Sequence, residues 1–479
     1  MLFNSTEFLI FFPVVVITYY VLPGKAKKYW LLITSYYFYM CWNVRYALLL
    51  LFSTAVTYLS GRLMFTKQGR YKKLVVAISF TLNLGILFFF KYFNFVFTSL
   101  SAIANKLGIV FAQPRLDLLL PVGISFYIFQ ALSYTMDIYR EKLEVERNFF
   151  TYALYVSFFP QLVAGPIERS TSLLPQLRST PPPRITETTH ITRGLQLMLW
   201  GFFEKIVIAD TAAGVVDRVY NNFEAMNGLQ IIGATVLFAF QIYCDFGGYS
   251  HIAIGAAQVL GFKLMDNFRQ PYFSTSVKEF WRRWHISLST WFKDYLYIPL
   301  GGNRLGRLKT KCNIMIVFLL SGLWHGTSWN YVIWGGLNGL FQLGNTPING
   351  REKGIKKYLS ILATFCLIDF TWLFFRAPGF RYGCRMLKRI WTLPQSWSVK
   401  ENLVQMGFTK TNLAVLAIAL LILFAVDILH ENKVRIRDRL ALIPAWLRWG
   451  IYLAACEMIL LEIVIRYGQP ATAFLYFQF

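Results

Sequence analysis

The sequence has 479 residues, of which 56% are hydrophobic, 18% aromatic and only 15% charged, and its mean hydropathy is +0.45. Soluble domains carry charge on about a quarter of their residues, so this composition excludes an ordinary soluble protein and indicates a membrane protein. The net charge of +24 would suggest a nucleic-acid partner in a soluble chain. Here the basic residues lie in short loops between apolar runs, so we expect membrane lipid, and no nucleic acid, as the partner.

Apolar runs that could cross or enter a membrane follow one another along the whole chain. The first lacks a preceding positive flank and a following cleavage pattern, so we expect a retained span rather than a signal peptide. Several runs are short or contain Gly and Pro, which favours burial in protein or beside a wet cavity. We expect an all-α, polytopic integral membrane protein with a single domain over residues 1–479. In chain order the predicted segments are Phe8–Leu22, Tyr29–Met40, Ala47–Leu59, Leu74–Phe97, Leu118–Ala131, Tyr152–Val163, Leu195–Ile208, Gly233–Tyr249, Asn313–Leu323, Trp329–Phe341, Leu359–Phe375, Leu413–Leu429 and Trp446–Ile465.

Two loops are crowded with basic residues, one between Arg62 and Lys73 and one between Lys433 and Arg439. Both are predicted to be cytoplasmic. One strong apolar segment follows the second loop, so the tail, residues 466–479, is predicted to be extracytoplasmic. The basic stretch Arg376–Arg389 fits neither side cleanly and leaves open the number of spans between the two loops.

The stretch 262–311 mixes aromatic with basic residues and is too polar to span a membrane. Helices that lie in the membrane interface have this composition, with Trp and Tyr at headgroup depth and Arg and Lys outward. We expect interfacial helices on the cytoplasmic side.

Two of the five histidines lie in unusual surroundings. His325 follows a long apolar run in "FLLSGLWHGTSWNYVIWGGLNG", whose glycines permit close helix packing around a polar group. A histidine at membrane depth is costly unless it has a partner, so it is a functional candidate, and imidazole is well suited to remove a proton from a hydroxyl near neutral pH. His285, in "WRRWHISLS", is the second candidate. The structural role is favoured for the other three, which are His190, His251 and His430.

Acidic residues within apolar runs are further candidates, either as structural partners of bases such as Lys205 and Arg376 or in catalysis. Asp245 is the foremost of them, because Gly247 and Gly248 are expected to open the helix there. Metal binding is not indicated, since no H-E-x-x-H or paired Cys/His pattern occurs and the six cysteines are scattered. The sequence has no G-x-S-x-G signature, and a Ser–His–Asp triad stays an open alternative.

Three sequence blocks together resemble the membrane-bound O-acyltransferase superfamily, and in particular its bacterial alginate and peptidoglycan O-acetylation branch. They are "YCDFGGYSHIAIGAAQVLGF", "NFRQPYFSTSVKEFWRRWHISLSTWFKDYLYIPLGGNR" and "LSGLWHGTSWNYVIWGGLNG". The resemblance extends along nearly the whole chain. It implies a bowl of roughly 11–13 transmembrane or re-entrant helices around a tunnel, in the bacterial plasma (inner) membrane. The key histidine falls on His325 and the second catalytic position on His285, while Asp245, Trp324 and Asn330 are candidates to line the tunnel.

The chain ends in "FLYFQF", which places Phe474, Tyr476 and Phe479 in an F-x-Y-x-x-F arrangement. An aromatic tail can simply anchor at lipid headgroups. A similar motif in related cell-wall acylation systems implies instead that Tyr476 carries the acyl group, with Phe474 and Phe479 supporting it.

The resemblance therefore implies an O-acyltransferase, specifically an acetyltransferase. Its donor would be acetyl-CoA or another acyl thioester, its final acceptor a polysaccharide or peptidoglycan, and its partner an extracytoplasmic acyltransferase of the SGNH type. A lipid-acylating enzyme of the same superfamily and a secondary transporter are the alternatives, although a transporter usually shows paired halves that are not seen here.

Overall fold

A computed structural model describes residues 1–66, 69–109, 111, 114–163, 165–179, 188–344, 354–392, 396–465 and 474–475 of the chain. Every regular element in these ranges is a helix, so the all-α prediction is confirmed. The chain divides into two compact units. One comprises Met1–Gly194 with Ala253–Met265, and the other comprises Leu195–Ile252 with Asp266–Phe479.

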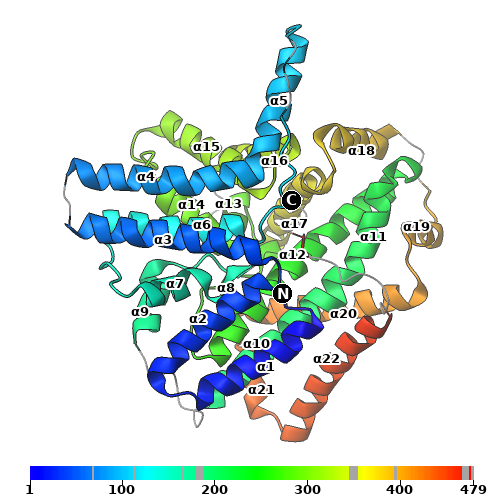
Figure 1. The fold of residues 1–479 in the computed structure, drawn as a ribbon. Coiled ribbons are helices and arrows are strands. Elements are labelled where there is room, and N and C mark those ends of the chain that lie inside the picture. Colours follow the sequence, from blue (N-terminus) through cyan, green and yellow to red (C-terminus); the bar gives the residue numbers. More distant parts are fainter. Residues whose placement is uncertain are drawn as a thin grey trace. The chain divides into compact units, whose positions relative to one another are not determined.

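The first unit contains α1 to α9, which Figure 1 draws in blue to teal, the start of α10 and the end of α12. Their bounds are α1 (Thr6–Val21), α2 (Gly24–Met40), α3 (Val44–Thr66), α4 (Arg70–Leu87), a π-helical turn η1 (Phe88–Tyr92), α5 (Phe93–Lys106), α6 (Ile124–Tyr139), α7 (Phe149–Ser157), α8 (Phe159–Leu162), α9 (Ser170–Arg178) and the start of α10 (Thr188–Phe202).

The second unit begins within α10 and contains the helices that carry both candidate histidines. Their bounds are η2 (Phe203–Ala209), α11 (Asp210–Asn221), η3 (Phe223–Ala225), α12 (Gly228–Val259, whose residues from Ala253 onward belong to the first unit), η4 (Pro271–Phe273), α13 (Val277–Arg283), α14 (Ile286–Phe292), η5 (Lys293–Tyr297), α15 (Arg307–His325), α16 (Trp329–Gly344), α17 (Ile355–Arg376), α18 (Phe380–Thr392), α19 (Val399–Met406), α20 (Lys410–Glu431), α21 (Ile436–Leu442) and α22 (Ala445–Ile465).

Five stretches of helix in the described residues are long and apolar enough to cross a membrane, which confirms a polytopic membrane protein. They are Val44–Thr66, Arg70–Lys106, Gly228–Val259, Ile355–Arg376 and Lys410–Glu431. Other predicted segments are shorter or broken. The segment expected over Leu118–Ala131 becomes helical only at Ile124, because Pro121 and the left-handed Gly123 (φ +72°) precede it.

In the first unit, α3 packs through a face of small polar residues against α4, α6 and α7 (Figure 1). The Tyr152 hydroxyl of α7 donates to Oγ1 of Thr57 at 2.7 Å. A Cβ on Gly61 would lie 2.7 Å from the Tyr134 hydroxyl of α6, so a larger residue there would displace the buried Tyr134 ring. Small residues allow close approach, and hydroxyls hydrogen-bond across the interface where lipid cannot. The buried members of this face are Ser53, Thr54, Thr57, Ser60 and Gly61.

One expectation about the second unit is wrong. Gly247 and Gly248 do not open α12 beside Asp245, because α12 is a continuous helix from Gly228 to Val259. Gly248 instead serves a helix crossing, since a Cβ there would lie 2.6 Å from the carbonyl oxygen of Gly201 on α10.

The glycines around His325 do bring two helices into backbone contact, as the sequence predicts. A Cβ on Gly322 of α15 would overlap the carbonyl oxygen of Tyr331 on α16, and a Cβ on Gly335 would overlap the carbonyl oxygen of Phe318. Helix α15 ends at His325 and α16 begins at Trp329, so this contact between the two helices fixes where the imidazole lies.

Replacing Gly322 by Ala is expected to separate α15 from α16 and to lower the free energy of unfolding by about 1–3 kcal/mol, the usual cost of overpacking. Thermal unfolding in detergent, followed by tryptophan fluorescence, measures the loss. Gly336→Ala is the matched control, because its nearest atom is the flexible Leu319 Cδ2 at 3.4 Å. Equal midpoints for the two variants would show that backbone contact is not required.

Candidate active site

The two candidate histidines lie in one aromatic cluster of the second unit. Their ring centroids are 6.3 Å apart, and both side chains are almost fully buried, with 1% of His285 and 3% of His325 exposed. Trp324 contacts both, its ring centroid lying 6.0 Å from that of His285 and 5.0 Å from that of His325. The structure thus brings together three predicted site residues that come from two separate motifs.

Further aromatic rings surround His325. Trp334 of α16 and Phe375 of α17 meet its ring edge-on, with centroids 5.1 Å and 5.7 Å away. Trp334 is in turn stacked on Trp372 at 5.7 Å. Rings of this kind supply apolar walls around a polar centre and keep water from it.

Asn267 holds His285 in one orientation. The amide Oδ1 of Asn267 lies 3.1 Å from Nδ1 of His285 and accepts a hydrogen bond from the Ser287 hydroxyl at 2.9 Å. The amide nitrogen of Asn267 donates to the Ser250 hydroxyl at 3.1 Å. Because the oxygen therefore faces the ring, Nδ1 of His285 carries the hydrogen and Nε2 keeps its lone pair.

The backbone of His285 is also constrained. Its φ of +43° lies in the left-handed region, which is costly for a residue with a side chain. Two main-chain hydrogen bonds hold it, from Ile286 N to Asn267 O at 2.9 Å and from Arg269 N to Arg283 O at 3.0 Å. Burial, and next the neighbouring His325, keep the pKa of His285 well below its ordinary value of 6.5. The ring is consequently neutral at neutral pH and can accept a hydrogen bond at Nε2.

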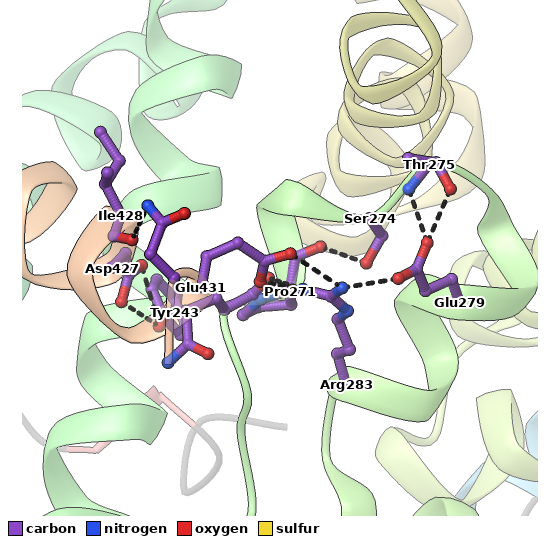
Figure 2. A network of polar contacts seen from close by, with 11 residues as sticks. Tyr243, Pro271, Ser274, Thr275, Glu279, Arg283, Asp427, Ile428 and Glu431 are labelled. Carbon is purple, nitrogen blue, oxygen red and sulfur yellow. Dashed lines mark hydrogen bonds and ion pairs between the residues drawn. The ribbon is translucent and has the colours of Figure 1, made fainter. Parts of the chain in front are cut away.

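Arg283, two residues before His285 in the sequence, is the centre of a network of ion pairs (Figure 2). Arg283 donates to Glu279 on its own helix at 2.6 Å and to Glu431 at the end of α20 at 2.7 Å. Thr275 adds hydrogen bonds to Glu279 from its backbone N–H and its hydroxyl, at 2.9 Å and 2.7 Å. The network ties α13, and with it the segment that carries His285, to the end of α20.

The stretch 262–311 was predicted to form interfacial helices. It folds into short helices, η4, α13, α14 and η5, none of them long enough to span a membrane, before α15 begins at Arg307. Its placement on the cytoplasmic side stays a prediction.

Asp245 lies in the interior of the second unit beside a buried lysine. Its Oδ1 is 2.6 Å from Nζ of Lys205, and the same Nζ is 2.7 Å from Asp210. The expected pairing of an acid with Lys205 is therefore confirmed. The other base singled out by the sequence, Arg376, pairs with Asp217.

The described part of the C-terminal tail is also buried in this unit. Phe474 is 0% and Leu475 4% exposed. The Phe474 ring lies 4.5 Å from that of Tyr249 and 5.6 Å from that of Phe246, and the Phe246 ring meets that of His285 at 4.5 Å. One ring thus bridges the tail and the histidine cluster. Tyr476 and Phe479 lie outside the described residues.

Asn330 occupies a structural position next to the cluster. Its amide nitrogen donates to the carbonyl oxygens of Phe374 and Ala377 at 3.3 Å and 3.0 Å, at the end of α17. Its role in lining a tunnel stays a prediction.

Of the remaining histidines, His190 lies 2.7 Å from the Tyr20 hydroxyl and His251 pairs with Glu204 at 2.5 Å.

The groove on α22 is separate from the histidine cluster. A groove of about 710 Å³ is lined by Thr411 and residues of α22 from Leu453 to Ile465, and it includes neither candidate histidine. Within the described residues no group of three or more His, Cys, Asp or Glu side chains could hold a metal ion.

Sequence reasoning missed Asn267, Ser287 and Asp210. Asn267 and Ser287 are common polar residues in a stretch rich in them, and no spacing connects Asn267 with His285 before the chain folds. The Arg283 to Glu431 contact joins positions 148 residues apart and is equally invisible in the sequence.

Buried histidines, a tryptophan-rich centre and several membrane-spanning helices define the class, which is that of a polytopic membrane enzyme. The chain belongs to the membrane-bound O-acyltransferase family, whose family model matches residues 140–349, and it is therefore a multi-pass membrane O-acyltransferase. The protein named probable alginate O-acetylase AlgI of Pseudomonas putida is 34% identical over the whole of both chains. The peptidoglycan O-acetyltransferase of Helicobacter pylori is 34% identical over 81% of this chain and 79% of its own. The teichoic acid D-alanyltransferase of Bacillus subtilis is 26% identical over 56% of this chain and 72% of its own.

The Glu279 network predicts a specific pH dependence of stability. Burial raises the pKa of Glu279, but the Thr275 hydrogen bonds and the Arg283 guanidinium outweigh it and bring the pKa below its ordinary value of 4.5. A carboxyl with a lowered folded-state pKa stabilises the fold above its unfolded pKa, and that stabilisation is lost as pH falls through the folded pKa. Glu279→Gln is therefore expected to flatten the acid limb of a curve of melting midpoint against pH below about pH 5.

The exposed acid Asp266, which pairs with Arg269 on the surface, provides the matched control. Asp266→Asn is expected to keep the wild-type acid limb. If Glu279→Gln keeps it as well, the network does not stabilise the segment that carries His285.

Proposed function

We propose that this enzyme takes an acetyl group from a cytoplasmic thioester, acetyl-CoA, and passes it across the bacterial inner membrane for O-acetylation of an extracytoplasmic polysaccharide or peptidoglycan. The relatives named alginate O-acetylase and peptidoglycan O-acetyltransferase support this acceptor class. The observation that carries the proposal is that two buried histidines share one aromatic cluster with the C-terminal tail.

In the proposed reaction, the imidazole of His325 removes the proton from the acceptor hydroxyl while the hydroxyl oxygen attacks the thioester carbonyl. The new C–O bond forms and the C–S bond breaks. The imidazolium then returns the proton to the departing thiolate, so the donor leaves as free CoA thiol. The donor docks beside the basic aromatic stretch 278–307, and the apolar rings around His325 limit hydrolysis of the thioester by water.

His285 orients the reacting groups rather than taking the proton. Its Nδ1 is engaged by Asn267, its lowered pKa makes it a poor base, and its neutral Nε2 can accept a hydrogen bond. Trp324 and Asp245 line the path that the acyl group follows, and Asn330 shapes it through its hold on the end of α17.

Tyr476 is the proposed first acceptor, with Phe474 and Phe479 fixing the tail. A phenol is a better leaving group than a sugar hydroxyl, so an acyl-tyrosine could receive the acetyl group and still pass it on. Burial of the preceding residue, Leu475, supports this assignment over a headgroup anchor. Transfer from Tyr476 to the polymer falls to a separate extracytoplasmic acyltransferase of the SGNH type.

Mass spectrometry on purified protein incubated with acetyl-CoA tests the relay. We expect an acetyl adduct on the Tyr476 peptide of the wild type and none in His325→Ala or Tyr476→Phe. The contrary outcome combines two results: purified wild-type protein carries no adduct, and polymer acetylation in cells still requires His325. Transfer would then be direct, and the tail would serve only as an anchor. Labelled acetyl recovered in the lipid fraction instead would favour the lipid-acylating alternative.

Removing the group that orients His285 is expected to slow turnover without unfolding the protein. Asn267→Ala frees the imidazole to change tautomer, and we expect turnover to fall about 10-fold to 100-fold, part of the contribution that positioned proton-transfer groups make. Ser289→Ala is the control, because the described hydrogen bond of that hydroxyl goes to the Trp284 carbonyl oxygen and not to Asn267 or the His285 ring. Turnover of Asn267→Ala at the wild-type rate, measured as CoA release, would contradict the role given to His285.

A further inference from the structure

The tail is held by a polar contact that charge balance does not require. Lys205 is buried between two carboxylates, Asp210 and Asp245, with side chains exposed by 1%, 9% and 4%. A single carboxylate is enough to neutralise one buried ammonium, and a further buried charge is costly unless another group satisfies it. One of the two carboxylates therefore has another function.

The surplus carboxylate oxygen binds the tail. Oδ1 of Asp245 faces Lys205, whereas Oδ2 accepts the backbone N–H of Leu475 at 2.7 Å. Hydrogen bonds from a backbone N–H to an ionised oxygen are about twice as strong as neutral ones. The described contacts of Asp210 include Lys205 but not the tail.

The surroundings of this bond fit a peptide segment and fix its register. Phe474 is fully buried against Tyr249 and Phe246, which lie on the same helix as Asp245. A main-chain bond at one residue and an aromatic side chain at the residue before it prevent the segment from sliding along α12. The same Phe246 ring touches His285.

We propose that Asp245, Phe246 and Tyr249 form a binding site for the chain's own C-terminal segment, in which Asp245 positions the tail by accepting the Leu475 N–H. This site deepens the proposed function and rests on it in one respect: the residue that it holds directly precedes Tyr476 in the sequence. Asp245 is thus a positioning residue that sets where the tail hydroxyl is presented, and Lys205 orients its carboxylate.

The test compares two variants that make the same change of charge beside the same lysine. Asp245→Ala removes the acceptor of the Leu475 N–H and leaves a neutral Lys205–Asp210 pair. Asp210→Ala leaves a neutral Lys205–Asp245 pair with the tail bond intact. Both are made in the full-length enzyme in detergent, and hydrogen–deuterium exchange of the tail peptide is read by mass spectrometry without any acyl donor.

We expect exchange at Leu475 to rise at least 10-fold in Asp245→Ala and to stay within about twofold of wild type in Asp210→Ala. Acetylation of the tail should fall in the first variant and persist in the second. Asp245→Asn, which keeps a neutral acceptor oxygen, should lie between, and it serves if the alanine variant does not fold. Unchanged exchange in both Asp245 variants, or an equal rise in Asp245→Ala and Asp210→Ala, would overturn the proposal.

The outcomes separate the two hypotheses. A wild type that protects Leu475 but carries no acetyl group contradicts the acyl-tyrosine relay and leaves the binding site standing. A wild type that is acetylated, with Asp245→Ala acetylated equally well, keeps the relay and removes Asp245 from it.

Discussion

Hydrogen bonds and ion pairs between buried polar groups hold the helices of this structure together. Lipid offers no hydrogen bonds, so an unpaired donor or acceptor in the interior costs several kcal/mol. The Thr57 hydroxyl meets Tyr152, the Asn330 amide meets the end of α17, and Lys205 meets two carboxylates. Helices that would be indifferent to one another in lipid are thereby joined in one register, and the same rule makes a buried histidine pair expensive to retain without a function.

Close glycine packing sets where that pair lies. Because Gly322 and Gly335 bring the α15 and α16 backbones together, α15 ends at His325 directly against the rings of α16 and α17. His285 reaches the same point from a different direction, at a left-handed residue held by Asn267 and, through Arg283, by α20. The site is therefore assembled from short helices on one side and a tight apolar hairpin on the other.

How far the sequence predicts this arrangement depends on whether a feature is local. The membrane class, the helical fold and the close contact around His325 follow from composition and from glycines within one motif. The partner of His285 does not, because Asn267 lies 18 residues away with no periodic relation to it. The prediction for the glycines beside Asp245 was wrong for a related reason. In a sequence, a glycine that opens a helix cannot be distinguished from one that allows a neighbouring backbone to approach, and only the structure shows that Gly248 lies against Gly201. Leu475 and Asp245 are 230 residues apart, and only folding brings them together.

The strength of the tail contact bears on how a carrier residue could serve two catalysts. A hydrogen bond to a charged group contributes about 1.5–3 kcal/mol, and an aromatic contact such as that of Phe474 with Tyr249 adds about 0.5–1.5 kcal/mol. Since each 1.4 kcal/mol is tenfold in an equilibrium constant, contacts of this size keep the segment docked most of the time and still allow a minor undocked population. A covalent tether keeps the local concentration of the tail high, so weak contacts are enough for return. A tail held much more tightly would accept an acyl group and then fail to deliver it, whereas one held only by lipid would seldom present its hydroxyl to His325.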